Sequence, residues 1–341
     1  MSLRRITLSL ILVIVFAVPL TAISQGSLLF LTFEPGGRAN GMGRAYTAVA
    51  DDAFAMWWNP GATAFNREGQ LALNHIPWLQ GSGLNDMFYE YLGWNQYFEG
   101  IGNLNAHIVL LDAGTQEHTD SNQVYLGTFH PFDIAGAVGY SYEMIPEILG
   151  VGANFKLIYS YLAPGTGSTE KEGKAFSFGF DLGAKYRNAA NINGLDLALV
   201  LQNLGPDVTF VDQDQADPSP MTVRAGAAYR VLDNPMSRFT ISAEASKMLA
   251  NEDPLFKRFV TGWEHIDETI YSAGAEYLYL DLIALRGGYF ADTAGKITGP
   301  SFGVGLQYTF DQKYKLTADF SMVPGGELTD FNKVFSLGVE Y

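Results

Sequence analysis

Residues that could carry enzymatic chemistry are present in this sequence, but their spacing does not suit it. The five histidines (His75, His107, His118, His130 and His265) are scattered, and no two of them have the HExxH spacing that places two zinc ligands on one face of a helix. Cysteine is absent, which excludes disulfides and thiol catalysis. Neither GxGxxG nor the Walker phosphate-binding loop occurs. We therefore predict a protein without catalytic residues, metal site or cofactor.

Two local motifs have both a chemical and a structural interpretation. Residues 299–303 read Gly-Pro-Ser-Phe-Gly and match GxSxG, which needs a strand-to-helix turn to expose its serine. Here an alternating strand pattern follows and no helix pattern, so we favour glycines within a strand. A predicted loop also gathers oxygen ligands that could bind calcium, but without EF-hand spacing a solvated acidic loop is favoured. These ligands are Asp207, Asp212, Asp214 and Asp217.

The elements that would position such residues are strands, because apolar residues alternate with polar or small ones over much of the chain. Residues 176–182, 195–201, 302–310 and 314–322 are examples. Successive side chains of a strand point to opposite faces, so each segment has one apolar face and one polar face. The polar face carries Gly, Ser, Asn and scattered charges. This pattern is typical of a barrel with lipid outside and water inside.

Counting these segments predicts an all-β protein, a fourteen-stranded antiparallel transmembrane barrel over residues 70–341. Pro131 is expected to force a bulge or break in the fourth strand. Turns at one end are all tight and loops at the other are longer, as in outer-membrane barrels, which predicts that both termini are periplasmic. The predicted strands are 70–77, 86–95, 101–118, 124–143, 148–161, 174–187, 193–203, 219–231, 237–248, 268–279, 282–291, 298–310, 314–322 and 333–341.

The N-terminus predicts export from the cytoplasm. Arg4 and Arg5 precede an apolar stretch at residues 6–17, and small residues precede Gln25, so residues 1–24 read as a secretory signal. A membrane anchor is the alternative, but the apolar stretch is short for a spanning helix. The formal net charge of the whole chain is −15. Such acidity argues against a nucleic-acid partner.

Residues 25–69 differ from the rest because they are rich in Gly and Ala and do not alternate. Gly36–Gly43 is predicted to be a loop, and Arg44–Val49 and Asp52–Trp58 are predicted to be short helices. Asn59-Pro60 would end the second helix. Because the lumen of a fourteen-stranded barrel is too wide for wall side chains to fill, we expect this segment to plug it. Trp57 and Trp58 could line a ligand slot or fill the core of the plug, and we favour the core.

The alternation also predicts eleven charged side chains that face the lumen. Five are basic and six are acidic, which favours ion pairs with one another and with charges of the plug over an ion or solute path. The plug charges are Arg38, Arg44, Asp51 and Asp52. The predicted lumen charges are Lys156, Lys185, Arg224, Arg286, Lys315, Asp181, Asp196, Glu244, Glu276, Asp319 and Glu340.

The last strand ends on an aromatic residue, with Phe335, Leu337, Val339 and Tyr341 on one face. This pattern resembles the C-terminal signal that the outer-membrane barrel assembly machinery reads. Ser336 stands where that signal would have a glycine.

The N-terminal segment strongly resembles the start of the PorV/PorQ family, whose members are outer-membrane barrels similar to the fatty-acid channel FadL. Shorter matches lie at residues 152–156, 202–206, 274–277 and 285–289. Gly61 departs from the more usual Asn-Pro-Ala of the family. The resembling residues are Gly36, Gly37, Arg38, Asn40, Gly41, Met42, Gly43, Arg44, Asp51, Asp52, Trp57, Trp58, Asn59 and Pro60.

The resemblance implies a FadL-like barrel with an N-terminal hatch and a role in type IX secretion without catalysis. PorV-like proteins bind the C-terminal domains of exported proteins and deliver them from the translocon to the surface attachment machinery. The implied partners are outer-membrane lipid, the translocon and its exported proteins. Two alternatives stay open. One is FadL-type uptake of a hydrophobic small molecule, suggested by the Asn59-Pro60 signature and the paired tryptophans, and the other is a structural barrel.

Overall fold

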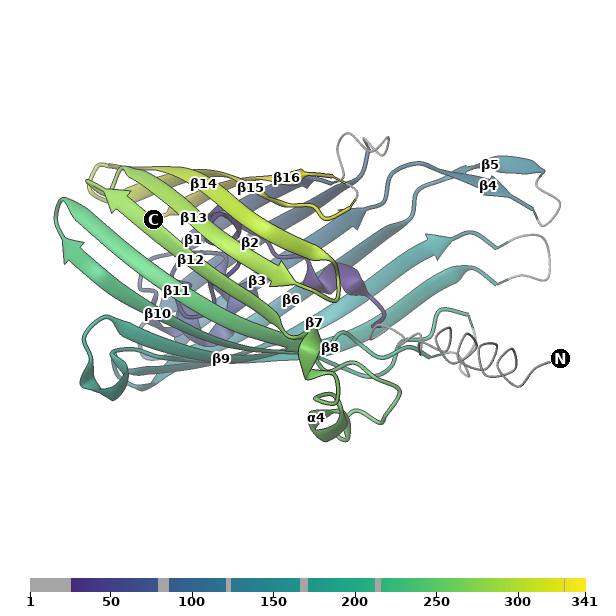
Figure 1. The fold of residues 1–341 in the computed structure, drawn as a ribbon, viewed down its shortest axis with the longest axis horizontal. Helices are drawn as coiled ribbons and strands as arrows, with labels where there is room; N and C mark the ends of the chain where they lie inside the picture. Colours follow the sequence, from purple (N-terminus) through teal and green to yellow (C-terminus); the bar gives the residue numbers. More distant parts are fainter. Residues whose placement is uncertain (1–25, 79–85, 121–123, 166–170, 212–215, 328) are drawn as a thin grey trace, which may run out of the picture.

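The structure is a closed antiparallel barrel of fourteen strands (Figure 1). The computed structural model describes residues 26–78, 86–120, 124–165, 171–211, 216–327 and 329–341. Each barrel strand pairs with its neighbours, and β1 pairs with β16 to close the ring. The predicted fold is therefore confirmed. The signal at residues 1–24 lies outside the described residues.

Most strand bounds agree with the alternation within a few residues. β1 and β11, for example, have the predicted bounds. The barrel strands are β1 Gln70–Pro77, β2 Phe88–Phe98, β3 Gly102–Asp112, β6 Phe132–Ile145, β7 Leu149–Ala163, β8 Gly173–Tyr186, β9 Leu195–Leu204, β10 Thr222–Asn234, β11 Ser237–Met248, β12 Ile270–Tyr279, β13 Ile283–Asp292, β14 Ile297–Phe310, β15 Tyr314–Pro324 and β16 Phe331–Glu340.

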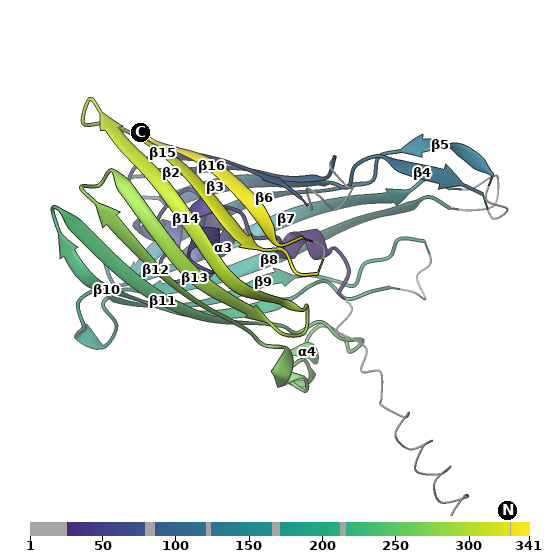
Figure 2. The same cartoon turned by 45° about the horizontal axis from the view of Figure 1, so that its top comes forward.

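The third and fourth predicted strands are wrong in their extent. Residues 101–118 contain β3 and then β4 (Gln116–Thr119), and residues 124–143 contain β5 (Tyr125–Phe129) and then β6. β4 and β5 pair with each other in a separate hairpin that extends beyond the barrel (Figures 1 and 2). Pro131 lies between β5 and β6, where the missing N–H of proline ends the strand.

The two ends of the barrel differ as the turn lengths predicted. The short-turn end carries turns such as Asp311–Lys313 between β14 and β15. The long-loop end carries the β4–β5 hairpin and the β11–β12 loop, which contains α4 (Arg258–Thr261) and a short 3-10 turn, η5 (Ile266–Glu268). At the short-turn end, Tyr341 exchanges backbone hydrogen bonds with Gly69, N to O distances of 2.8 and 3.0 Å.

The first described residues lie at the opposite end from the C-terminus. Ser27 N donates to Pro218 O at 2.8 Å, in the loop that precedes β10, at the long-loop end. The sequence predicted both termini on one side, and this prediction does not hold for the start of the described chain. The reason is that residues 26–69 run the length of the lumen before β1 begins at the short-turn end.

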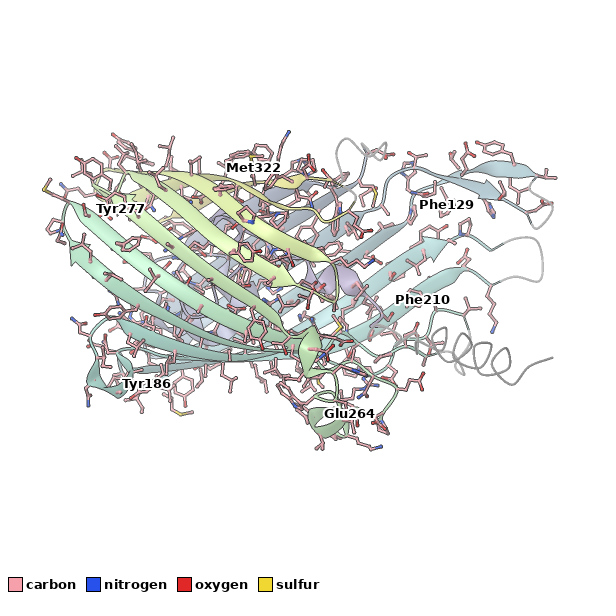
Figure 3. All side chains as sticks on the ribbon, in the orientation of Figure 1. Phe129, Tyr186, Phe210, Glu264, Tyr277 and Met322 are labelled. Atoms are coloured by element: carbon pink, nitrogen blue, oxygen red, sulfur yellow. The ribbon has the colours of Figure 1, made fainter. Side chains whose placement is uncertain are left out.

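The two faces of the wall carry the side chains that the alternation predicted (Figure 3). Outward residues are large, apolar and exposed, such as Phe176 at 71% and Tyr308 at 63%. Inward neighbours such as Ser177 and Gln307 are buried. No helix in the described part of the chain is long and apolar enough to cross a membrane.

Residues 26–66 lie inside the ring and form four short helical segments. Arg44 has φ +67°, a left-handed conformation that stops a helix, so the helix predicted at Arg44–Val49 is absent. The loop predicted at Gly36–Gly43 is also wrong, because Gly37–Gly41 forms a helix. Of the helix predicted at Asp52–Trp58, only the last four residues are helical. The segments are η1 Leu29–Thr32, α2 Gly37–Gly41, α3 Ala55–Trp58 and η2 Pro60–Phe65.

Candidate functional site

The candidate site is the contact between residues 26–69, here named the hatch, and the inner wall. α2 packs against β13, β14, β15 and β16, while η2 packs against β3, β6, β7 and β8, nearly opposite in the ring. The hatch divides into a charged half, residues 34–52, and a neutral half, residues 53–66, which has no charged residue.

Arg38 is the centre of the first ion-pair network. Its guanidinium donates to both carboxylate oxygens of Glu276 on β12 at 2.8 Å and lies 2.5 Å from Asp51 Oδ1. Arg286 on β13 donates to the same Glu276 at 2.7 Å and to Asp319 on β15 at 2.6 Å. The fork of an arginine matches a carboxylate in two parallel hydrogen bonds, so this network fixes the orientation of α2 against the wall.

Glu34 is the centre of a second network. Its carboxylate forms an ion pair with Arg44, whose Nε lies 3.0 Å away, and accepts a hydrogen bond from Arg224 on β10 at 2.7 Å. Arg224 also pairs with Glu244 on β11 at 3.1 Å. The other oxygen of Glu244 accepts from the backbone N–H groups of Tyr46 and Thr47 at 3.0 and 2.9 Å. A wall carboxylate therefore satisfies backbone N–H groups of the hatch that have no hydrogen-bond partner within a helix.

The charged half also approaches the wall backbone closely. Gly43 has φ +64°, and a Cβ there would lie 2.6 Å from Ala273 O and from Tyr289 N. A Cβ on Gly41 would lie 2.9 Å from the Cα of Gly303. Only glycine fits such backbone contacts.

Two wall hydroxyls complete this docking. Ser301, the serine of the GxSxG match, lies within β14 and donates to Gly41 O at 3.3 Å. Ser336 accepts from Gly37 N at 3.0 Å, which accounts for a serine where the assembly signal would have glycine.

The neutral half docks through amides, hydroxyls and bare backbone. Asn59 Nδ2 donates to Ala184 O at 3.1 Å, and its Oδ1 accepts from Gly61 N at 3.0 Å. A Cβ on Gly61 would lie 2.4 Å from Gly183 O, so the alanine usual in the family does not fit here. The Thr63 and Ser141 hydroxyls are 2.6 Å apart.

Side-chain amides of the wall also donate hydrogen bonds to backbone carbonyls of α3. Asn154 donates to Met56 O at 2.8 Å, and Gln202 donates to Trp57 O at 2.7 Å. The terminal carbonyls of a short helix lack intrahelical partners, so these contacts hold α3 in place.

The two tryptophans fill the core of the hatch. Trp58 is fully buried and donates from Nε1 to Pro35 O at 2.9 Å, and Trp57 is 4% exposed. Their rings are 5.0 Å apart, and the Arg224 guanidinium lies 5.4 and 5.2 Å from the two ring centres. Both tryptophans therefore fill the core of the hatch and do not line an open ligand slot.

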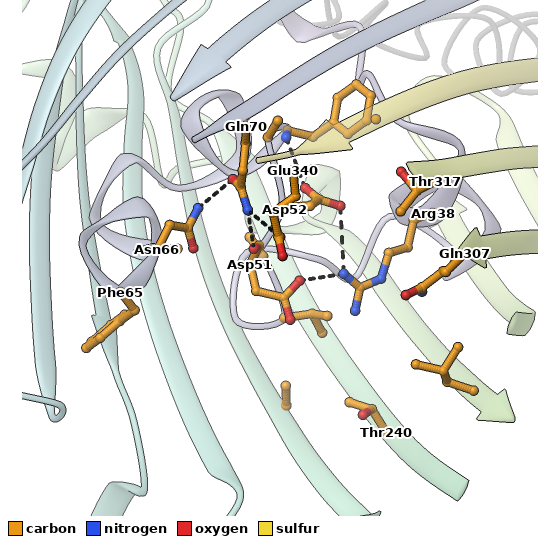
Figure 4. Close-up of a pocket in the computed structure, with 18 of the residues that line it drawn as sticks. Arg38, Asp51, Asp52, Phe65, Asn66, Gln70, Thr240, Gln307, Thr317 and Glu340 are labelled. Atoms are coloured by element: carbon orange, nitrogen blue, oxygen red, sulfur yellow. Dashed lines mark hydrogen bonds and ion pairs between the residues drawn. The ribbon is translucent and has the colours of Figure 1, made fainter. Parts of the chain in front are cut away.

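A cavity of about 390 Å³ lies at the short-turn end, between the hatch and β8 to β16 (Figure 4). Its lining includes seven basic and seven acidic residues, so it is polar and nearly neutral overall. The basic residues are Arg38, Lys185, Arg187, Arg230, Arg238, Arg286 and Lys315, and the acidic residues are Asp51, Asp52, Glu68, Asp196, Asp233, Asp319 and Glu340.

Two neighbouring carboxyls of the hatch differ in acidity. Burial inside the barrel raises the pKa of Asp51, but the charge and hydrogen bond of Arg38, together with the charges of Lys185 and Lys315, lower it to about 2. Burial also raises the pKa of Asp52, and Arg38 offsets only part of this. Asp51 therefore stays ionised beside Arg38, and Asp52 binds a proton more readily than a free aspartate does.

The remaining predicted lumen charges also lie inside. Lys156 and Asp181 pair within the wall at 2.7 Å, and the backbone N–H of Asn203 donates to Asp181 at 2.9 Å. Lys185 reaches the hatch carbonyls of Val49 and Ala50 at 3.2 and 3.0 Å.

Sequence analysis missed several residues of this site. Glu34 was overlooked because the alternation that assigns faces does not extend into the hatch. Asn154 and Gln202 lie within the family matches, and Ser336 was noted in the C-terminal signal, but no contact with the hatch was predicted for them. The inward position of each residue on its strand was the available signal.

The predicted acidic loop contains one aspartate with an arginine partner. Asp207 pairs with Arg258 of α4, so its carboxylate has a protein partner. Asp212 and Asp214 lie outside the described residues. Within the described residues, no group of three or more His, Asp or Glu side chains could hold a metal ion.

Comparisons with known proteins agree with this architecture. Among solved structures, the toluene transporter TbuX of Ralstonia pickettii is 13% identical with a TM-score of 0.58, over 90% of this chain and 98% of that chain. The toluene transporter TodX of Pseudomonas putida is 12% identical with a TM-score of 0.53, over 90% and 97%. At such identities the likeness shows the fold alone.

A comparison with curated proteins gave no match. The family model described as "Type IX secretion system protein PorV" matches residues 20–256, more than half of the chain. The chain therefore belongs to the PorV family of type IX secretion system outer-membrane barrels.

Proposed function

We propose that this protein is a non-catalytic outer-membrane component of type IX secretion and offers its long-loop end as a surface for exported proteins and the translocon. The family match carries this proposal. The packing of the lumen supports a platform rather than a passage, because the hatch is bonded to the wall on nearly opposite sides.

The proposed orientation follows from the two ends of the barrel. In outer-membrane barrels the short turns face the periplasm and the longer loops face outward. We therefore place the C-terminus in the periplasm. The β4–β5 hairpin and α4 would then be outside, and the first hatch residues would lie near the outer mouth.

The secretion role is tested by deletion of the gene in a host that carries a type IX system. We expect exported proteins with the shared C-terminal domain to be retained and a wild-type copy to restore their surface attachment. A tagged barrel, solubilised from native membranes after crosslinking, should carry the translocon barrel or such exported proteins. Normal attachment in the deletion strain would contradict the proposal.

The plug role of residues 25–69 is tested separately. Reconstituted wild-type protein is expected to conduct little in planar bilayers, and deletion of residues 36–66 is expected to open a large, steady conductance. Gly287→Ala, where a Cβ meets no atom within 4 Å, is a matched control on the wall. Equal conductance of the deletion and the wild type would mean that this segment does not plug the barrel.

A second candidate is uptake of a small hydrophobic molecule, favoured by the fold shared with two toluene transporters. Two observations weigh against it. The cavity beside the hatch is lined by charged residues, whereas small-molecule sites are mostly apolar. The ring of strand pairs is also complete. Flux of toluene into vesicles that contain the barrel, above that of empty vesicles, would favour this candidate.

A further inference from the structure

The loop between β11 and β12 exposes a cluster of large apolar side chains at the long-loop end. Phe256 is 81% exposed and Val260 is 77% exposed. Ile266, Trp263 and Phe259 are exposed at 57%, 41% and 38%. A contiguous apolar surface of this kind marks a contact with another molecule or with a membrane.

The cluster has the spacing of one helix face. Phe256, Phe259, Val260 and Trp263 recur at intervals of three, one and three residues, around α4. Residues with this spacing share one side of a helix. The polar side carries Lys257, which pairs with Asp253 at 2.6 Å.

The loop is held in this conformation by buried bonds. Arg258 is fully buried, pairs with Asp207 and donates to Asp253 O at 2.6 Å. Lys247 on β11 pairs with Glu268 at 2.7 Å. These contacts hold the loop in a conformation in which its apolar side chains stay on the surface.

The position of α4 indicates what covers this face. Figures 1 and 2 place α4 beside the wall at the rim, radially outward, whereas the β4–β5 hairpin extends along the barrel axis. Tyr271, the second residue of β12, is 59% exposed on the outer face of the wall. The loop that carries these apolar side chains therefore lies beside the lipid-facing surface of the barrel.

We propose that the apolar side of residues 256–266 lies in the outer-leaflet interface and anchors the rim of the barrel to lipid. Amphipathic helices with aromatic and aliphatic residues on one side bind membrane surfaces in this way. The indole N–H of Trp263 already donates to Phe259 O at 3.0 Å, so its ring enters an apolar layer without an unpaired donor. The proposal requires that the barrel spans the membrane and, for the choice of leaflet, the orientation proposed above, and it is independent of the secretion role.

The experiment uses spin labels, since the chain has no native cysteine. A nitroxide is attached to Val260→Cys in the full mature barrel, reconstituted into vesicles of phosphatidylethanolamine and phosphatidylglycerol. Collision rates with oxygen, which concentrates in lipid, and with a water-soluble nickel chelate are then compared. We expect the ratio to place the label roughly 5–10 Å below the headgroups.

Two labels serve as controls. Leu126→Cys, on a hairpin residue that is 51% exposed, tests an apolar side chain away from the wall. Lys257→Cys tests the polar side of the same loop. Both labels should remain accessible to nickel. Heat-modifiable mobility on gels verifies that each variant has folded.

An aqueous label at Val260→Cys in these vesicles would overturn the proposal. If the same label becomes protected only in native membranes that contain other proteins, the face binds a protein partner instead, and the lipid anchor is likewise excluded.

Discussion

The two halves of the hatch dock on the wall through different kinds of interaction. Residues 34–52 dock through buried ion pairs, in which Arg38 shares Glu276 with Arg286. Residues 53–66 carry no charge of their own and dock through Asn59, Thr63 and glycine contacts. An ion pair in a closed lumen is costly to break because one charge is left unpaired, whereas neutral contacts depend on shape.

Because the interactions differ, each half of the hatch should be weakened by a different kind of change. The charged half should respond to charge removal and to acid, and the neutral half should respond to added volume. Peptide-level hydrogen exchange reports each half separately, because each half has bonded backbone N–H groups. Tyr46 and Thr47 donate to Glu244 in the charged half, and Gly61 donates to Asn59 Oδ1 in the neutral half.

The largest effect is expected from Arg38→Met. It removes one of the two arginines that pair with Glu276 and the nearest cation of Asp51 and Asp52. Because Arg286 still pairs with Glu276, we expect a loss of about 3 kcal/mol, the lower end of the cost of breaking a buried pair. The free energy of opening of residues 36–47 should fall by that amount in hydrogen exchange, with a smaller change in residues 53–66. Lys315→Met is the control, since Lys315 lines the same cavity. Equal effects of the two variants would mean that net charge, not contact, holds the hatch.

A smaller loss is expected from Gly43→Ala. The left-handed φ costs an alanine about 1–2 kcal/mol, and the clash with the β12 and β13 backbone adds to it. Exchange in residues 36–47 should rise again. Gly287→Ala adds the same methyl group to β13 where no atom lies within 4 Å, and it should leave exchange unchanged.

Gly61→Ala tests the neutral half in the same way. Its Cβ would meet Gly183 O, and overpacking of this kind costs about 1–3 kcal/mol. We expect faster exchange confined to residues 53–66. Gly136→Ala on β6, where a Cβ has open space, is the matched control. Faster exchange in residues 36–47 as well would show that the two halves open together.

The smallest effect is expected from acid. The folded pKa of Asp51 is about 2, below its unfolded value of about 3.9, so its contribution to stability is complete above pH 4 and declines as the pH falls toward 2. Asp52 has a raised pKa and opposes this by binding a proton in the folded state. Because the Asp51 side chain is 59% exposed to the cavity, we expect less than about 1 kcal/mol.

Hydrogen exchange at pH 4 and pH 2.5 checks this window. Asp51→Asn should reduce the acid response of residues 36–47, and residues 53–66 should not respond in either protein. An unchanged acid response in the variant would assign the titration to other carboxyls.

Much of the barrel was predictable because each strand carries its own pattern. Phe176 and Ser177 show opposite faces in sequence and in structure. The hatch was less predictable. Helices of four or five residues have little intrinsic stability, and the helix at α2 forms where Ser336 and Asn74 accept from Gly37 and Gly36. The β4–β5 hairpin was missed because its strands continue the alternation of β3 and β6 across Pro131.

The amino-acid sequence alone specified the number of barrel strands and the face of each strand side chain. These follow from local periodicity and residue type. The pairing of Arg38 with Glu276, 238 residues away, and of Glu34 with both Arg44 and Arg224 arises only in the folded barrel. Those pairings depend on how the ring closes and on where the hatch lies against it. No local sequence pattern encodes either of these.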